Sequence, residues 1–421
     1  MATFEKYLFC SLCTKENRPS LDGLSFFFFT FVKKYDILIS LLSQGETYMK
    51  KYDIAAYVWP SYTGDELRSR MFWPEGNGEW QTVKSATAKY EGHTWPRKPL
   101  WGYVNEADPA VMEMEIDAAK SHGVNVFIYD WYWYDGRPFL ENCLNDGFLK
   151  AKNCSDMQFY IMWANHNASH LWNKELADTE CAETVIWRGG VDRDEFRKLS
   201  RRLCDKYFHL DNYYKIDGKP VFMIYDLPTL ISGMGGEKNT RAALDEFREY
   251  VKSSGLAGLH IQFTGRRSNV PNLSGVDSSN LKTSADEIAK ELSLDSFTHY
   301  QFVHYLDVDR DYRDIARDAN EYRDKIDKTV SLPYFAHVSC GWDNNPRFKK
   351  FRPQVVKNNT PENFEAALRD AKAFVDAHPE RAPLITVNSW NEWTETSYLE
   401  PDDIYGYGYL DAIKKVFVDE S

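Results

Sequence analysis

Eight short apolar runs, separated by helical patterns, constrain the fold of this chain more than any other feature of its sequence. Most of them are continuous rather than alternating, which is typical of parallel strands buried on both faces. The runs cover residues 53–60, 125–136, 158–167, 220–226, 258–265, 297–303, 335–345 and 384–393. Eight strands that alternate with helices predict an α/β fold, a (β/α)8 TIM barrel. A doubly wound sheet is the alternative, but no G-x-G-x-x-G follows the first run.

Four of the intervening segments carry clear helix signals. In the first, Asp108 and Pro109 can begin a helix with one apolar face, and Gly123 can end it. In the second and third, apolar residues at helical spacing occur over residues 196–207 and 244–251. In the fourth, Thr360 and Pro361 can begin another helix with an apolar face. The segment 61–107 is rich in Trp, Tyr, Gly and Pro and carries no such signal. We therefore expect a barrel with long loops, of which residues 61–107 form the clearest.

The first 48 residues differ in pattern from the rest of the chain. We predict that residues 1–48 are an N-terminal appendage and that residues 49–421 form a single catalytic barrel. The apolar runs before Met49 are shorter than the roughly 20 residues that a membrane span needs. No basic segment or clean cleavage site marks an export signal, so a cytoplasmic location is expected.

The charge and the cysteine content limit the partners, cofactors and cellular compartment that we expect. The net charge is -12 and no Lys/Arg block is present, so we expect no nucleic-acid partner. Seven irregularly spaced cysteines indicate a reducing compartment rather than a disulfide framework. Cys10 and Cys13 form one C-x-x-C without a second pair, so no metal site and no cofactor is predicted. The sequence does not indicate an oligomeric state.

Aromatic and polar residues recur where the predicted strands end. Active sites of (β/α)8 barrels form at these carboxyl ends. Aromatic faces can stack on sugar rings, and the polar groups can pair with hydroxyls, so we expect an oligosaccharide or polysaccharide substrate. The candidate substrate-binding residues are Tyr57, Trp59, Asp130, Trp131, Trp133, Trp163, Asn165, His166, Asn167, Asp226, Trp342, Asp343, Asn344, Asn391, Trp393 and Tyr398.

Two glutamates, Glu392 and Glu395, follow the last predicted strand. Glycoside hydrolysis typically uses two carboxyl groups that flank one bond. A spacing of three places both on one side only if the chain turns helically after the strand. Two carboxylates this close repel, which favours a protonated acid beside an ionised partner. A solvated loop with two capping glutamates is the alternative interpretation.

The stretch "NSWNEWTETSYLEP…YGYGYL" resembles the N-E-W-x-E region of family 99 glycoside hydrolases and, more closely, of the WbsX-like proteins that are described as glycosyltransferases. The blocks "FIYDWYWYDGRPFLENCL", "FYIMWANHNASHLW" and "GWDNNPR" are similar to other blocks of that group and occur in the same order. The resemblance runs from about Met49 to the C-terminus. It implies a (β/α)8 barrel that acts on glycans.

The same resemblance implies roles for the two glutamates. Glu395 would be the general acid/base, and Glu392 would assist attack by the sugar's own 2-hydroxyl, with retention through a 1,2-anhydro sugar. The family-99 enzymes cut internal α-mannosidic bonds, so we expect a retaining, endo-acting hydrolase of an α-linked, mannan-like or bacterial glycan. The sequence departs from the pattern at Thr396, where glycine is usual, and at His166 and Ala168, where a glutamate and a tryptophan often stand. These departures leave the identity of the sugar open.

Three other functions remain open from the sequence. A glycosyltransferase would need a sugar-nucleotide site, and the D-x-D strings at Asp307–Asp309 and Asp309–Asp311 match the usual metal motif. A non-catalytic glycan-binding barrel would be expected to lack one of the two glutamates. A metal hydrolase could use Asp130, His166 and Asp226, although no standard metal-ligand spacing is present.

Overall fold

The computed structural model describes residues 52–64, 66–266 and 285–420. The compact unit in it begins at Tyr52. The predicted appendage at residues 1–48, with Cys10 and Cys13, lies outside the described residues. Within the described part of the chain, no helix combines the length and apolar character that crossing a bilayer requires.

All eight predicted strands are present and form one parallel barrel sheet, which confirms the predicted fold class. The strands are β1 (Asp53–Val58), β2 (Val126–Tyr134), β4 (Gln158–Trp163), β8 (Lys219–Ile224), β9 (His260–Gly265), β10 (Ser296–His299), β11 (Ala336–Ser339) and β12 (Leu384–Asn388). Their order around the sheet is β10-β9-β8-β4-β2-β1-β12-β11, and each neighbouring pair is parallel. Apart from their first residues, nearly all positions are buried, as expected of strands covered on both faces.

The barrel closes between β10 and the residues that lead into β11. Phe297 and Tyr334 form a parallel bridge. The Phe297 amide donates to the carbonyl of Pro333 at 3.1 Å, and the Phe335 amide donates to the carbonyl of Phe297 at 2.9 Å. The two ends of the sheet therefore meet, and the strand ends share one rim.

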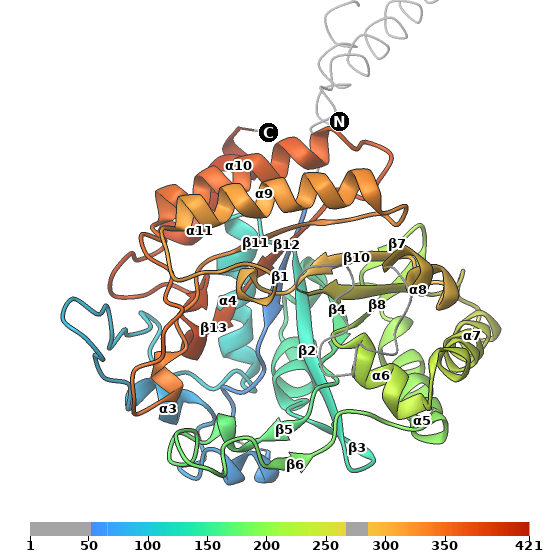
Figure 1. Ribbon diagram of the computed structural model, residues 1–421, viewed down its shortest axis with the longest axis horizontal. Helices are drawn as coiled ribbons and strands as arrows, with labels where there is room; N and C mark the ends of the chain where they lie inside the picture. The colour runs from blue at the N-terminus through green and yellow to red at the C-terminus, as the bar shows by residue number, and fades with distance from the viewer. Residues whose placement is uncertain (1–51, 65, 267–284, 421) are drawn as a thin grey trace, which may run out of the picture. The chain divides into compact units, whose positions relative to one another are not determined.

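Helices surround the strands (Figure 1). The longer ones are α4 (Pro109–Ser121), α5 (Arg193–Leu203), α6 (Leu227–Met234), α7 (Glu237–Ser253), α8 (Ala285–Glu291), α9 (Tyr312–Thr329), α10 (Pro361–Asp376) and α11 (Gly408–Lys414). Only short turns connect β2 to β4: η2 (Cys143–Gly147), η3 (Phe148–Lys150) and η4 (Cys154–Asp156). One repeat of the barrel thus lacks a full covering helix.

The residues that we expected to cap helices do so in the structure. The Asp108 side chain accepts a hydrogen bond from the Ala110 amide, and Pro109 occupies the first turn of α4. Thr360 caps α10 in the same way, through the Asn363 amide. The apolar stripes on α5, α7 and α10 are buried against the sheet or against neighbouring helices.

Small β-hairpins extend the carboxyl-end loops. They involve β3 (Arg137–Phe139) against β2, β5 (Ala168–Ser169) against β6 (Val185–Trp187), and β13 (Asn391–Glu392) against β14 (Ser397–Tyr398). At the opposite end of the barrel, β7 (Lys215–Ile216) pairs with β8. The long segment 61–107 holds only the short helices η1 (Leu67–Met71) and α3 (Trp80–Lys84) before α4.

Polar side chains fill part of the barrel interior and pair with one another. Thr298 and Thr386 share a hydrogen bond of 2.8 Å, and His337 Nδ1 lies 3.0 Å from Thr386 Oγ1. The Tyr57 hydroxyl donates to the carbonyl of His299 at 3.0 Å. Buried polar groups are stable only when paired in this way. The paired interior gives the strand ends a rigid base.

Candidate active site

The two predicted catalytic glutamates lie on one tight turn. After β12 the chain forms β13, then the 3-10 turn η10 (Trp393–Glu395), then β14. Glu392 immediately precedes this turn and Glu395 ends it. A 3-10 helix has three residues per turn, so side chains three apart lie on the same side. The chain therefore makes the helical turn that the spacing required. Glu392 is 3% exposed and Glu395 is 9% exposed.

One arginine joins the two glutamates. Arg347, at the end of η9 (Asn345–Arg347), donates from Nη1 to Glu395 Oε1 at 2.6 Å. Its Nη2 donates to Glu392 Oε2 at 3.2 Å. The two terminal nitrogens of one guanidinium thus hold the carboxyl groups side by side.

Glu79 completes this ion cluster. Its Oε1 accepts hydrogen bonds from Arg347 Nε at 3.2 Å and from the Thr394 hydroxyl at 3.0 Å. Its Oε2 accepts a short hydrogen bond from the indole of Trp59. Glu79 is fully buried in the segment 61–107, where no pattern in the sequence singled it out. Three carboxyl groups therefore share one cation.

Three carboxyl groups beside one cation affect how strongly Glu392 and Glu395 hold a proton. Burial, reinforced by the charge of Glu395 and opposed by Arg347, raises the pKa of Glu392 well above its ordinary value. Burial also raises the pKa of Glu395, while the charge and the hydrogen bond of Arg347 oppose the rise. In the free protein Glu392 therefore holds a proton more strongly than Glu395, whose carboxylate form Arg347 favours.

A tyrosine links Glu392 to a third strand end. The Tyr300 hydroxyl lies 2.9 Å from Asp130 Oδ2 and 3.2 Å from Glu392 Oε1. One phenol proton cannot fully satisfy two carboxylates. Burial raises the pKa of Asp130 well above its ordinary value, although the Tyr300 hydrogen bond opposes this. Asp130, Tyr300 and Glu392 thus form a hydrogen-bonded network that favours the protonated form of its carboxyl groups.

Several predicted contact residues lie near this network. His166 packs against the rings of Tyr132 and Tyr225, with centroids 5.6 and 5.5 Å away. Burial lowers the pKa of His166 to about 4, so the imidazole is neutral at pH 7. Burial also raises the pKa of Asp226, whose Oδ2 accepts from the Thr229 hydroxyl at 3.0 Å. Asn167 is exposed, and its Oδ1 accepts from the Gly189 amide at 3.0 Å.

Other predicted contact residues are buried supports in this structure. Tyr57, Trp59, Trp163, Asn165, Asn391, Trp393 and Tyr398 are all 2% exposed or less. Asn391 clamps the loop to the end of β1, because it accepts from the Trp59 amide at 2.7 Å and donates to the Trp59 carbonyl at 2.9 Å. Trp393 and Tyr398 stack on each other with centroids 3.8 Å apart. We expected these side chains to frame the sugar, but here they hold the loop that carries the glutamates.

Further buried candidates pack away from the glutamates. Trp163 contacts Phe196 of α5, with centroids 5.8 Å apart. Asn165 exchanges hydrogen bonds of 2.8 Å with the backbone of Asp226, which ties the end of β4 to the end of β8. Trp131 stacks on Trp133 with centroids 5.6 Å apart, and their indoles donate to Glu141 and Glu195. Side-chain direction along a strand could not be assigned from composition alone.

The end of β11 contributes three predicted residues around a neighbouring cavity. Trp342 and Asp343 line it, and Asn344 precedes η9. The Asp343 amide donates to the carbonyl of Glu395 at 2.7 Å. Burial alone would raise the pKa of Asp343, but hydrogen bonds from His93 and Asn345 hold it below its ordinary value. Asp343 is therefore ionised.

The D-x-D strings have structural partners. Asp311 caps α9 by accepting from the Arg313 amide. Asp309 pairs with Lys357 at 3.1 Å, and Asp307 accepts from the Asp309 amide at 3.3 Å. These carboxylates do not join Glu392 and Glu395.

A second carboxyl cluster contacts the loop that carries Glu392 and Glu395. Glu106, Glu115 and Glu400 are at most 3% exposed, and each offers an oxygen within 4.8 Å of the others. Each accepts a hydrogen bond from the loop: Glu115 from Trp390, Glu106 from Asn391 and Glu400 from Trp393. No local pattern in the sequence indicates this cluster, because its members come from separate segments.

The cluster must carry protons or a cation, because three buried charges are otherwise very costly. Burial raises the pKa of Glu106 to about 8 and raises the pKa values of Glu115 and Glu400 well above the ordinary value. Among the described residues it is the one group of His, Cys, Asp and Glu side chains close enough to share a metal ion, and its oxygens suit a hard divalent cation. Asp130, His166 and Asp226 form no such group.

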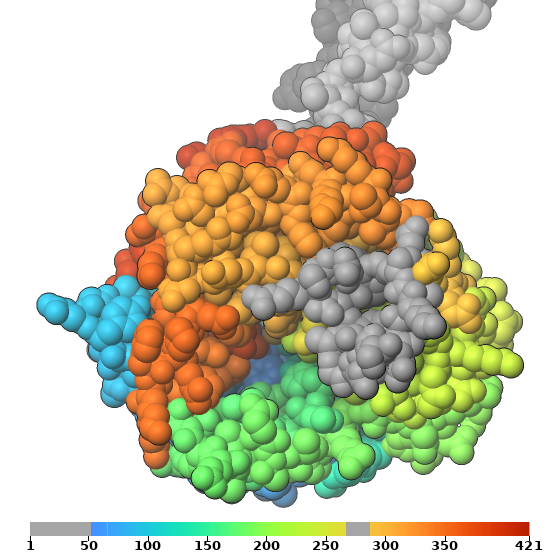
Figure 2. Space-filling view, viewed as in Figure 1, coloured from blue at the N-terminus to red at the C-terminus, as the bar shows by residue number. Residues whose placement is uncertain are grey.

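The face that carries the loops is hollowed between the orange segment near residue 350 and the green segment that holds β5 and β6 (Figure 2). A hollow on the face that carries the carboxyl-end loops is typical of the ligand sites of this fold.

Comparison with known proteins agrees with this architecture. In structure the chain is similar to a protein titled "Glycoside hydrolase-like protein", with a TM-score of 0.53, 14% identity, and coverage of 87% of this chain and 94% of that one. It is also similar to the GH99 endo-alpha-mannosidase from Bacteroides thetaiotaomicron, with a TM-score of 0.52, 13% identity, and coverage of 88% and 98%. At these identities the likeness establishes the shared barrel fold.

In sequence the chain is 25% identical over 353 residues to the uncharacterized protein WxcX of Xanthomonas campestris pv. campestris strain B100. The match covers 82% of this chain and 46% of WxcX, so the chain spans about half the length of that relative. The family described as Glycosyltransferase WbsX matches residues 54–413, which run from β1 into α11 and include both glutamates. The chain therefore belongs to the family described as Glycosyltransferase WbsX.

Proposed function

We propose that this protein is a retaining glycoside hydrolase that cuts an α-linked glycan, with endo action on a mannan-like or bacterial polysaccharide. One observation carries the proposal. Glu392 and Glu395 lie side by side on a rigid turn at the carboxyl end of the barrel, held by Arg347. Hydrolysis of a glycosidic bond needs two carboxyl groups in this relation.

The proposed reaction has two steps. Glu392 takes the proton of the sugar's 2-hydroxyl, whose oxygen attacks the anomeric carbon, while Glu395 donates a proton to the leaving oxygen. Water then opens the 1,2-anhydro ring with the two proton transfers reversed. Arg347 favours the carboxylate form of Glu395, and Glu392 holds a proton more strongly, so the proposal requires substrate to displace Arg347 from Glu395 and the proton to pass from Glu392 to Glu395. Loss of that cation would let Glu395 take up the proton it must donate.

The charge of the site favours a neutral glycan over a sugar nucleotide. Arg347 is already shared among Glu79, Glu392 and Glu395. A diphosphate would therefore meet an excess of carboxylates. The family description makes a glycosyltransferase the second candidate, and it would need a cation to offset this repulsion.

Activity on an array of α- and β-linked oligosaccharides tests the proposal. Wild type, Glu392→Gln and Glu395→Gln would be compared in EDTA, with the exposed Glu249→Gln as the matched control. We expect sugar release by wild type and by the control, and a loss of roughly 10²–10⁴-fold in each active-site variant. Release that either variant leaves unchanged would refute the assignment of that residue.

Aryl glycosides separate the two roles. A leaving phenol of low pKa needs no proton, so it should rescue Glu395→Gln but not Glu392→Gln. Rescue of Glu392→Gln alone would reverse the roles. Transfer from UDP- or GDP-sugars without any hydrolysis would instead establish the glycosyltransferase.

A further inference from the structure

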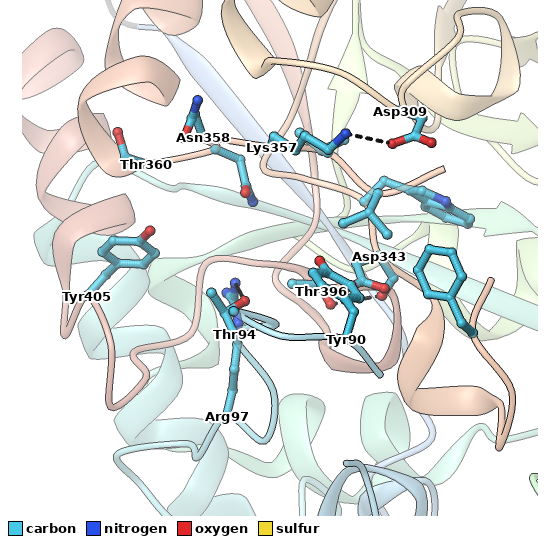
Figure 3. A pocket seen from close by; sticks show the side chains of 16 residues that line it. Tyr90, Thr94, Arg97, Asp309, Asp343, Lys357, Asn358, Thr360, Thr396 and Tyr405 are labelled. Carbon is cyan, nitrogen blue, oxygen red and sulfur yellow. Dashed lines mark hydrogen bonds and ion pairs between the residues drawn. The ribbon is translucent and has the colours of Figure 1, made fainter. Parts of the chain in front are cut away.

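A cavity of about 570 Å³ opens beside the catalytic loop. Its size is within the range of small-ligand sites. Residues from three separate segments, 90–97, 342–360 and 396–405, line it together with Asp309 (Figure 3). None of the residues proposed above to perform chemistry lines it.

The cavity is nevertheless coupled to the catalytic turn. Thr396 lines the cavity and follows Glu395 directly in the chain. Its hydroxyl donates to the carbonyl of Asp343 at 2.8 Å, and the Asp343 amide donates to the carbonyl of Glu395 at 2.7 Å. A ligand in this cavity would thus lie against the backbone that positions Glu395.

Two exposed aromatic rings form part of the cavity wall. Tyr90 is 43% exposed and Phe351 is 52% exposed, although most large apolar side chains of this protein are buried. The two rings meet edge to face, with centroids 5.6 Å apart. Tyr90 also stacks on His93 at 4.6 Å, which fixes the orientation of its ring. Rings held open to solvent in this way offer a flat apolar surface to a ligand.

Amide and phenol groups add unused hydrogen-bonding capacity. Asn358 donates through Nδ2 to Asp311 at 2.7 Å, and Asn359 donates through Nδ2 to the carbonyl of Cys340 at 3.2 Å. These bonds fix both amide planes. Among the described residues, no partner is found for the two Oδ1 atoms or for the hydroxyls of Tyr90 and Tyr405. Hydroxyl-rich ligands are suited to such a set of fixed acceptors and phenols.

The charges in the wall cancel. Lys357 pairs with Asp309 at 3.1 Å, a contact that Figure 3 marks. Arg97 is held by Asp402 at 3.7 Å and donates to Tyr398 and Thr94. Asp343 is bound to His93. A phosphate-bearing ligand would find no uncommitted lysine or arginine among these lining residues.

We propose that this cavity is a second carbohydrate subsite, which holds a neutral sugar unit of the glycan chain at a distance from the bond that is cut. Tyr90 and Phe351 would take the apolar face of the ring, and Asn358, Asn359 and Tyr405 would bind its hydroxyls. This inference rests on the proposed function and narrows it to substrates longer than the unit held at the two glutamates.

Binding is tested with the full chain carrying Glu395→Gln, so that the probe survives. The probes are neutral mono- and tetrasaccharides of mannose, glucose, galactose and N-acetylglucosamine, followed by saturation-transfer NMR and calorimetry, with UDP-glucose and GDP-mannose as charged comparisons. Tyr90→Ala and Phe351→Ala remove exposed rings, and Leu100→Ala, 52% exposed and outside the cavity, is the matched control. We expect at least one tetrasaccharide to bind roughly tenfold more weakly to each aromatic variant and unchanged to the control.

Three results would overturn the subsite: equal binding of the tetrasaccharides by all variants, no binding of any neutral probe at millimolar concentration, or ring-dependent binding of nucleotide sugars alone. The same experiments distinguish a failure of the proposed hydrolase activity from a failure of the proposed subsite. Ring-dependent tetrasaccharide binding without hydrolysis by wild type would keep the subsite and refute the hydrolase. Hydrolysis by wild type with the same KM in the aromatic variants would keep the hydrolase and refute the subsite.

Discussion

Replacing Glu115 by glutamine should make this protein more stable in alkaline solution. Glu115 is fully buried, its Oε2 accepts from Trp390 at 3.0 Å, and its Oε1 has no N–H or O–H partner among the described residues. A glutamine has the shape of the protonated acid and can still accept from Trp390, but it cannot ionise. The substitution therefore keeps the contacts and removes the titration.

The sign and size follow from the raised pKa values. Below about pH 4.5 the folded and unfolded chains both hold the proton, so the group contributes no pH dependence. Between that value and the folded pKa, only the folded chain holds it, and the free energy of unfolding falls as pH rises. For Glu106, whose pKa is raised to about 8, the fall reaches at most about 5 kcal/mol, at about 1.4 kcal/mol per pH unit.

Burial also raises the pKa of Glu115 well above its ordinary value, but the three carboxyl groups share protons and the individual effects do not add. We expect Glu115→Gln to gain about 2 kcal/mol at pH 8.5, or roughly 3 °C in Tm, and to match wild type at pH 5. Two further titratable groups beside the cluster are the Cys143 thiol and the phenol of Tyr129, and burial raises both of their pKa values well above the ordinary range.

Thermal unfolding between pH 5 and 9 measures this effect, and Glu113→Gln on the outer side of α4, where Glu113 pairs with Lys152, is the control. A variant that is less stable than wild type by the same amount at every pH would refute proton loading. Elemental analysis of the purified protein decides between protons and a cation. A stoichiometric divalent ion that Glu115→Gln loses would show that the cluster binds a metal instead.

Further expectations concern the site itself. Arg347→Met should leave Glu79, Glu392 and Glu395 without their cation and lower the free energy of unfolding at pH 7 by about 3–5 kcal/mol. Denaturant titrations should show that part of this loss is recovered at acidic pH. A free energy of unfolding equal to that of wild type would contradict the shared ion cluster. Tyr300→Phe should keep the packing against Tyr57 but reduce kcat roughly 10–100-fold, because Asp130 and Glu392 lose their common hydrogen bond. A change in KM alone would contradict this role of the Tyr300 hydroxyl. His166 should stay neutral down to about pH 5 in an NMR titration, since burial lowers its pKa to about 4. Its contribution to the free energy of unfolding should fall as the pH drops below 6.5. Protonation near pH 6.5 would show that the ring is solvated.

The sequence by itself determined the barrel and the position of the catalytic turn. Short continuous apolar runs are typical of strands covered on both faces, and their alternation with capped helices leaves few topologies. The pair Glu392 and Glu395 could be found because both glutamates lie on one short segment, where local spacing predicts local geometry. The same locality made Asp108 and Thr360 readable as helix caps.

Only the tertiary structure decided which polar and aromatic residues face a ligand. Trp393 and Tyr398 read as sugar contacts in sequence, yet they stack beneath the loop, because strand alternation and loop direction depend on packing across the barrel. Arg347 and Glu79 meet the glutamates from segments 45 and more than 300 residues away, and no local pattern encodes such a meeting. Protonation is likewise a property of the folded state, because it depends on which charges are buried together and on how far water is excluded from them.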